Sequence, residues 1–85
     1  MKKLNIEKLD EMTMTDLINL KDYLSKSFIK SDDRYNKATK AYRKNRTQVN
    51  KRNLEQVEKE RDQFRSDFHI VEDAISRKME GMRYE

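Results

Sequence analysis

The fold is decided by residues 41–57, which read AYRKNRTQVNKRNLEQV. Apolar positions are mirrored on the two sides of this stretch, and the pairs they form are centred on residue 48. Two helices that fold back on each other near that point would bring the members of each pair level and bury them in one strip, called the seam below. Counted outward, the pairs are Tyr42 with Leu54, Ala38 with Val57, Tyr35 with Arg61, Phe28 with Phe68, Leu24 with Val71, Leu17 with Met79 and Met14 with Met82.

Helix is the expected state of nearly the whole chain, because proline is absent and Gly81 is the only glycine. We predict one long helix over about 14–45 and a second over about 51–80, joined by a turn at 46–50. Residues 1–12 are expected to form an N-terminal arm or a short helix. The expected fold is therefore all-α: an antiparallel, coiled-coil-like helical hairpin within a single domain, 1–85.

The helix ends carry recognisable capping residues. Thr13 or Thr15 can cap the first long helix, with Asp16 near its positive end. The turn has no glycine, so its asparagines are the residues expected to adopt a left-handed conformation. Gly81 is expected to do the same after the second helix. In the N-terminal arm, Asn5 is the expected cap, and the expected apolar residues are Leu4, Ile6, Leu9 and Met12.

A single unbroken helix from Ser31 to Glu80 is the rival fold, since Ser31 begins a good capping sequence. The heptad spacing of Phe28, Tyr35 and Tyr42 argues against it. Continued past residue 49, that register would place only polar side chains in the seam: Arg52, Gln56, Lys59 and Gln63. A hairpin explains the break in phase, and a local change of helical pitch is the other explanation.

Composition limits how much the chain can bury. The 85 residues are 34% hydrophobic and 42% charged, whereas globular domains average about 45–50% and about 25%. Such a chain can bury a narrow strip between helices but no large core. Ile18, Leu20 and Ile70 flank the seam and are expected to stay half exposed. A second copy could cover them, so we expect a homo-oligomer, with a dimer of hairpins as its simplest form.

Catalysis and cofactor binding find no support in the residue types present. Cysteine is absent and His69 is the only histidine. Adjacent acidic pairs such as Asp32 and Asp33 point to different sides of a helix, so no metal site is expected. No apolar run approaches the roughly 20 residues of a membrane-spanning helix. We therefore expect a cytoplasmic, non-enzymatic protein without a cofactor or a membrane contact.

Positive charge is concentrated around the turn. The segment 34–54 contains no acidic residue and has a local charge of +8, whereas the whole chain has +4 and the remainder −4. These side chains are expected to be exposed and to form the binding site for nucleic acid. They are Arg34, Lys37, Lys40, Arg43, Lys44, Arg46, Lys51 and Arg52.

RNA or another polyanion is the partner that such a surface favours, because phosphate binding releases counterions. No zinc knuckle, aromatic RNP pattern or helix-turn-helix is present, so recognition would rest on shape and charge. Three other interpretations stay open. The basic residues could form a solvated helix face, they could dock an acidic protein, or the chain could be a structural coiled-coil adaptor or chaperone that acts through protein contacts.

Two aromatic residues and one arginine belong to the seam in this scheme. Tyr35 and Tyr42 are interpreted as seam residues rather than as platforms for base stacking. Arg61 falls opposite Tyr35, where it could stack on the ring or pair with Asp32 or Glu58.

The chain resembles the small, cysteine-free early accessory proteins of large T4-like phages, which are rich in lysine, asparagine, aspartate and methionine. The resemblance is one of size, composition and charge, and it includes the basic run from Arg34 to Arg52. Proteins of this kind include inhibitors of host toxin–antitoxin ribonucleases that work together with RNA. The resemblance implies a non-enzymatic, antitoxin-like inhibitor that acts in the host cytoplasm, with a host nuclease or toxin as a protein partner.

Overall fold

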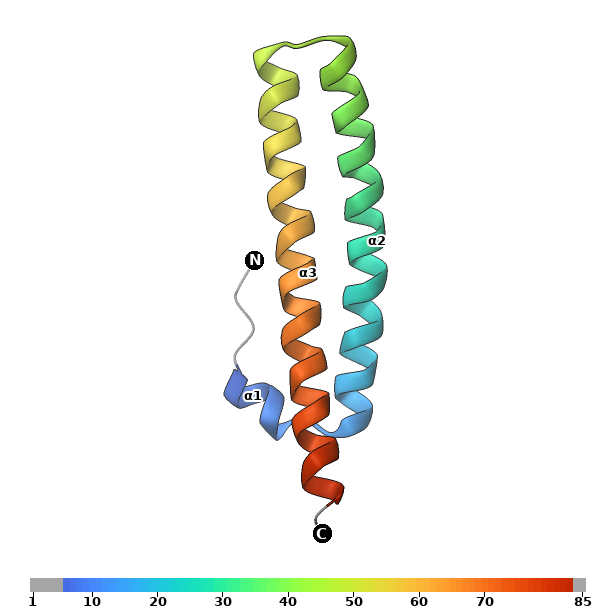
Figure 1. Ribbon diagram of the computed structural model, residues 1–85, viewed down its shortest axis with the longest axis vertical. Coiled ribbons are helices and arrows are strands. Elements are labelled where there is room, and N and C mark those ends of the chain that lie inside the picture. Colours follow the sequence, from blue (N-terminus) through green and yellow to red (C-terminus); the bar gives the residue numbers. More distant parts are fainter. Residues whose placement is uncertain (1–5, 84–85) are drawn as a thin grey trace.

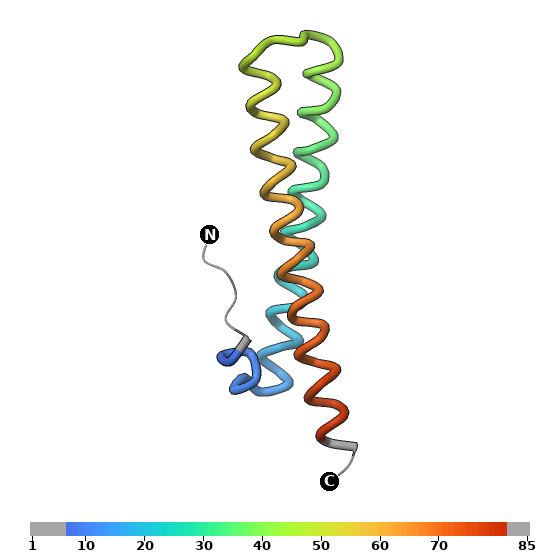
Figure 2. The backbone as a smooth tube through the Cα atoms, turned by 60° about the vertical axis from the view of Figure 1, so that its left-hand side comes forward, coloured from blue at the N-terminus to red at the C-terminus, as the bar shows by residue number. Residues whose placement is uncertain are grey.

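The structure of the chain, a computed structural model, describes the backbone of residues 6–83 and the side chains of residues 7–81. Within that range it contains three helices: α1 (Ile6–Glu11), α2 (Met14–Lys44) and α3 (Gln48–Arg83). α2 and α3 pack side by side and antiparallel in a rod of 58 × 18 × 15 Å (Figures 1 and 2). The predicted hairpin is confirmed, and the rival unbroken helix is wrong.

The N-terminal segment forms a short helix rather than an extended arm over the part that can be described. α1 packs on α3 near the end of the hairpin opposite the turn, called the base below (Figure 1). Asp10 of α1 and Arg77 of α3 form an ion pair of 3.0 Å there. The predicted cap Asn5 and its neighbour Leu4 lie outside the described residues. The side chains of Ile6 and Met82 do so as well, which leaves the pair of Met14 with Met82 without a structural account.

Thr13 caps the beginning of α2. The Asp16 backbone N–H donates a hydrogen bond of 3.1 Å to Oγ1 of Thr13. Thr13 is the residue before the helix, so the choice between Thr13 and Thr15 falls on Thr13. The Asp16 carboxylate lies in the first turn, where it stabilises the positive end of the helix.

The turn is shorter than predicted and lies earlier in the chain, at residues 45–47. Asn45 is extended, with φ −144° and ψ 97°. In the described part of the chain, no residue has a positive φ. The expectation of left-handed asparagines is therefore wrong. A tight turn reverses the chain instead, because the Thr47 N–H donates to the Asn45 carbonyl at 2.9 Å.

The best-buried core lies at the base, where all three helices meet. Leu9 of α1, Leu17 and Leu24 of α2, and Val71 and Ala74 of α3 form one cluster. Each of these side chains is at most 3% exposed. The short first helix therefore contributes to the core rather than trailing from it.

One pair of the predicted seam is wrong at the base. Met79 is 59% exposed and does not close over Leu17. The reason is that α1 and α2 both pack against this part of α3 and share its surface. Leu9 of α1 joins the cluster beside Ala74, so the buried strip of α3 centres on Val71 and Ala74. Sequence pairing considered only two helices and could not include this third contact.

Small and polar residues fill the middle of the seam. Ser31 is 3% exposed and Ala38 is 5% exposed, and they continue the seven-residue spacing of Leu17 and Leu24 along α2. Asp67 of α3 is also buried, and one of its oxygens accepts a hydrogen bond of 2.9 Å from the Gln63 amide. The sequence analysis did not assign Ser31 or Asp67 to the interior.

Arg61 is a seam residue, as predicted. Its guanidinium carbon lies 4.0 Å from the centre of the Tyr35 ring. It also pairs with Asp32 at 3.7 Å and with Asp62 at 3.3 Å, whereas the alternative partner Glu58 forms no ion pair with it. The Arg61 Nε atom is buried without a hydrogen-bond partner among the described residues. A buried polar contact of this kind favours one helix register over its neighbours.

The end of α3 differs from the prediction. Gly81 does not adopt a left-handed conformation and does not end the helix, which continues to Arg83. No atom lies within 4 Å of the position that a Cβ at Gly81 would occupy. No neighbouring element therefore forces the chain to turn at this residue.

Candidate polyanion-binding surface

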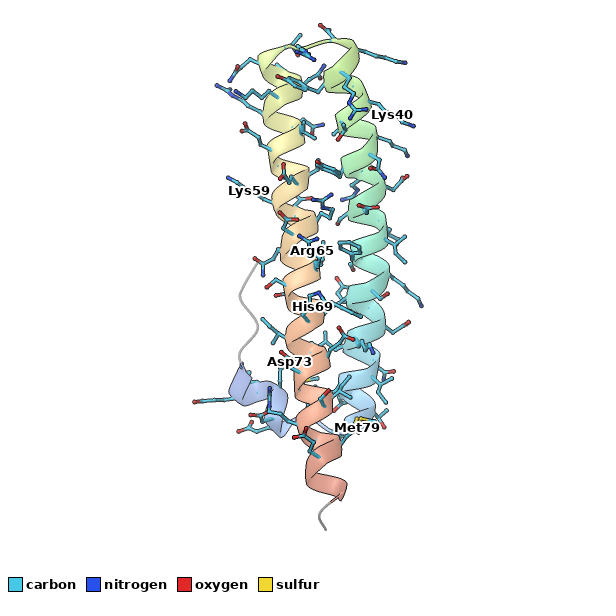
Figure 3. The ribbon with its side chains drawn as sticks, viewed as in Figure 1. Lys40, Lys59, Arg65, His69, Asp73 and Met79 are labelled. Atoms are coloured by element: carbon cyan, nitrogen blue, oxygen red, sulfur yellow. The ribbon has the colours of Figure 1, made fainter. Side chains whose placement is uncertain are left out.

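All eight basic residues predicted as the binding site are exposed, and they extend from the turn down α2 to Arg34 and along the start of α3 to Arg52. We call this set the basic tip. Figure 3 shows Lys40, one of its members, directed away from α3. The core and α1 lie at the opposite end of the rod, so the basic tip is remote from the part of the chain with the most buried apolar surface (Figure 1).

Most charges of the basic tip are not neutralised within the protein. Lys37 pairs with Asp33 at 3.1 Å, but both side chains are mostly exposed, and an exposed pair of this kind is weak. Among the described residues, no carboxylate forms an ion pair with the other seven basic residues of the tip. Outside the tip, the described cations are mixed. Acidic partners are present for Lys21, Lys26, Arg61, Arg65 and Arg77. Among the described residues, none is present for Lys8, Lys30, Lys59 and Lys78.

The two helix ends at the tip have opposite electrostatic effects on these cations. Arg43 and Lys44 lie in the last turn of α2, where the negative end of the helix favours them. α3 has no acidic residue in its first turn, and Lys51 and Arg52 lie near its positive end. That arrangement is unfavourable for an isolated helix. A bound anion would offset it.

The tip is held in shape by Asn50. Its side-chain amide donates to the Asn45 carbonyl at 2.7 Å and approaches the Ala41 carbonyl at 3.4 Å. Its backbone N–H donates to Oγ1 of Thr47 at 3.1 Å, so Thr47 caps α3. One residue of α3 therefore binds a carbonyl in the last turn of α2 and a carbonyl of the turn, and so fixes how the two helices meet.

Replacing Asn50 by alanine should lower the free energy of unfolding. The loss of the bond to the Asn45 carbonyl is expected to cost about 1 kcal/mol. Asn53→Ala is the matched control, because Asn53 is exposed and forms no side-chain hydrogen bond within the described residues. Both variants gain similar helix propensity, so the difference between their urea midpoints isolates the Asn50 contacts. Equal midpoints would show that these contacts do not hold the tip.

Tyr35 and Tyr42 are half-buried rather than presented to solvent. The ring of Tyr35 is covered by Arg61. Both residues are thus part of the seam, as the sequence analysis interpreted them. Val49, at the start of α3, is the exposed apolar side chain of the tip, with 75% of its surface accessible.

Sequence reasoning missed residues that line the surface just below the tip. Lys59 and Gln63 of α3 border an open hollow together with Arg34 of α2. Glu55 ends the stretch without acidic residues, and Glu58 and Glu60 flank Lys59, so the sequence does not mark Lys59 as part of the basic surface. The spacing of seven residues from Arg52 was the available signal, since residues seven apart share a helix face.

Two other kinds of site were sought in the described part of the chain. No described helix is long and apolar enough to cross a membrane. The same residues contain no group of three His, Cys, Asp or Glu side chains that could hold a metal ion.

Comparison with protein families, with curated proteins and with solved structures finds no match for this chain.

Proposed function

We propose that this protein is a non-enzymatic binding protein whose basic tip engages RNA or another polyanion. The observation that supports it most is a set of seven exposed basic residues toward one end of the hairpin that have no acidic partner among the described residues. Away from the tip, Lys21 pairs with Glu72 and Arg77 pairs with Asp10. The tip is where an external anion gains most from the charge of the protein.

The positive end of α3 adds to this argument. Lys51 and Arg52 stand near backbone N–H groups that favour negative charge. Phosphate is a suitable ligand for such a combination of cations and helix end. Repulsion between these cations and the positive end of α3 destabilises the free protein, and bound phosphate groups would reduce that repulsion.

A host ribonuclease or toxin is the protein partner in this proposal, and the host cytoplasm is its place of action. This part rests on the resemblance to phage accessory proteins in size, composition and charge. RNA held at the tip would then contribute to the contact with the nuclease.

The proposal is tested by binding of a fluorescein-labelled, single-stranded RNA to the purified protein across a salt titration. Engagement of about five phosphates predicts a slope of log affinity against log salt of about −3.5, and about a hundredfold loss between 50 and 200 mM salt. A pull-down from cells, with and without ribonuclease treatment, identifies partners that depend on RNA. Binding that does not respond to salt, or no binding at 50 mM, would contradict the proposal.

A coiled-coil adaptor that acts through self-association is the alternative. Its support is a set of exposed apolar side chains. Ile18 is 53% exposed, Ile29 is 63% exposed and Met79 is 59% exposed. Ile18 and Ile29 are eleven residues apart, which places them on one face of α2. A second hairpin packed on this face would give a four-helix arrangement. Sedimentation as a monomer at high micromolar concentration would count against the adaptor.

A further inference from the structure

A groove runs down one side of the hairpin from the basic tip. Two open hollows of about 490 and 370 Å³ form it, and both are bordered by Arg34. They are larger than the hollow of about 210 Å³ beside Phe28 and Phe68. Arg34 and Lys37 of α2 line one wall of the groove, and Lys59 of α3 lines the other. A ligand in the groove would therefore meet cations from both helices.

The rest of the lining suits flat, partly apolar groups. Ala41, Val57 and Phe64 contribute apolar surface between the walls. Asn53 and Gln63 add side-chain amides, which can both donate and accept hydrogen bonds. Unpaired bases present an aromatic face and polar edges together, whereas a duplex keeps its base faces inside. The lining thus favours a single strand over a duplex.

The length of the groove sets the size of its ligand. From Asn53 to Phe64, α3 rises about 16 Å at about 1.5 Å per residue. A stacked strand advances about 3.4 Å for each phosphate, so about five nucleotides fit. On α2, Lys44 continues the row of Arg34, Lys37 and Ala41 toward the turn, because these residues are three or four apart. The groove is therefore continuous with the basic tip.

The opposite side of the hairpin has acidic residues at the same level. Asp32 is two residues from Arg34, which lines the groove. Glu58 and Asp62 are each two residues from Glu60, which also lines it. Residues two apart point about 200° apart on a helix. On that opposite side, Asp32 and Asp62 both contact Arg61. The groove lining therefore holds three cations and one carboxylate, whereas the opposite side holds Asp32, Glu58 and Asp62 at the same level.

We propose that a single-stranded RNA segment of about five nucleotides lies in this groove. Its phosphates contact Arg34, Lys37 and Lys59, and its bases rest on the apolar lining. This inference rests on the proposed function, because it names the path that the RNA takes from the basic tip. Glu60 is the one acidic side chain in the lining of the two hollows.

Two pairs of charge-neutralising variants test the path, each with the same change in net charge. Glu60→Gln removes a carboxylate from the groove, and Glu58→Gln removes one from the opposite side. Arg34→Gln removes a cation from the groove, and Lys8→Gln removes one from α1, at the base of the hairpin. All four side chains are at least partly exposed, so thermal melts should match the parent. The probe is a fluorescein-labelled oligouridine of ten nucleotides.

At 0.1 M salt, Arg34→Gln should weaken binding about fivefold, the effect of one lost single-strand phosphate contact. Glu60→Gln should tighten it about threefold through lost repulsion. Lys8→Gln and Glu58→Gln should each change it less than twofold. A duplex RNA of equal charge should bind more weakly than oligouridine.

The outcomes separate this inference from the function it rests on. If both members of each pair behave alike while the parent binds with a steep salt slope, the groove is wrong and the basic tip stands. If the duplex binds as tightly as the single strand, the assignment of single-stranded RNA is wrong. If the parent does not bind RNA, the proposed function fails and the groove fails with it.

Discussion

Replacing Lys40, Lys44 and Arg46 together by glutamate should lower the affinity for single-stranded RNA by about a hundredfold at 0.1 M salt. Each lost single-strand phosphate contact is worth about fivefold at this ionic strength. The three added carboxylates repel the ligand as well. The salt slope should fall by about two, since three contacts of about 0.7 each are lost. All three side chains are exposed and unpaired with acidic residues in the described chain, so the fold should be retained.

Fluorescence anisotropy across a salt titration measures this effect, and circular dichroism checks the fold. The adaptor alternative predicts a different result. The charge-reversed protein would keep its protein partner, whereas Ile18→Glu would lose it, because Ile18 is exposed on the apolar face of α2. RNA binding equal to that of the parent at every salt concentration would show that the basic tip is a solvated face.

The hairpin could be predicted because its evidence is periodic and local. Seam residues on either side of the turn repeat at coiled-coil spacing, and the break in their phase marks where the chain reverses. The turn itself could not be placed as well. Its form depends on Thr47 as a cap and on the Asn50 amide, which reaches the Ala41 carbonyl of α2 and the Asn45 carbonyl of the turn. Such contacts form only after the helices meet.

Burial at the base could not be predicted from two helices alone. Leu9 was expected in a short helix, but nothing in the sequence says against which face that helix packs. Its contact with α3 buries Ala74 and leaves Met79 exposed. The burial of Asp67 could not be predicted, because a charged residue usually faces solvent. Its hydrogen-bond partner, the Gln63 amide one helical turn away, does not mark it as buried in the sequence.

The exposure of the basic tip could be predicted, because helical phase separates seam positions from outer ones. The groove could not, since it combines residues of two helices whose relative rotation is set by packing. Arg34 and Lys59 are 25 positions apart and border one hollow. A single sequence gives the face of each helix but not which faces adjoin.

Leu17→Ala should lower the free energy of unfolding by about 2–5 kcal/mol, the usual cost of truncating a buried leucine. Leu17 is 1% exposed and belongs to the cluster that joins α1, α2 and α3. A core this small rarely supplies more than about 3–5 kcal/mol in total. The variant should therefore lose most of the stability of the parent.

Ile18→Ala is the matched control for this variant. Ile18 is the next residue along the helix and is 53% exposed, so its truncation should change stability by no more than about 0.5 kcal/mol. Urea unfolding followed by circular dichroism measures both at low protein concentration, where self-association does not contribute. Similar losses for the two variants would mean that Leu17 is not the better-buried residue. A large loss for Ile18→Ala alone would contradict the burial that assigns the core to Leu17 rather than to the outer face of α2.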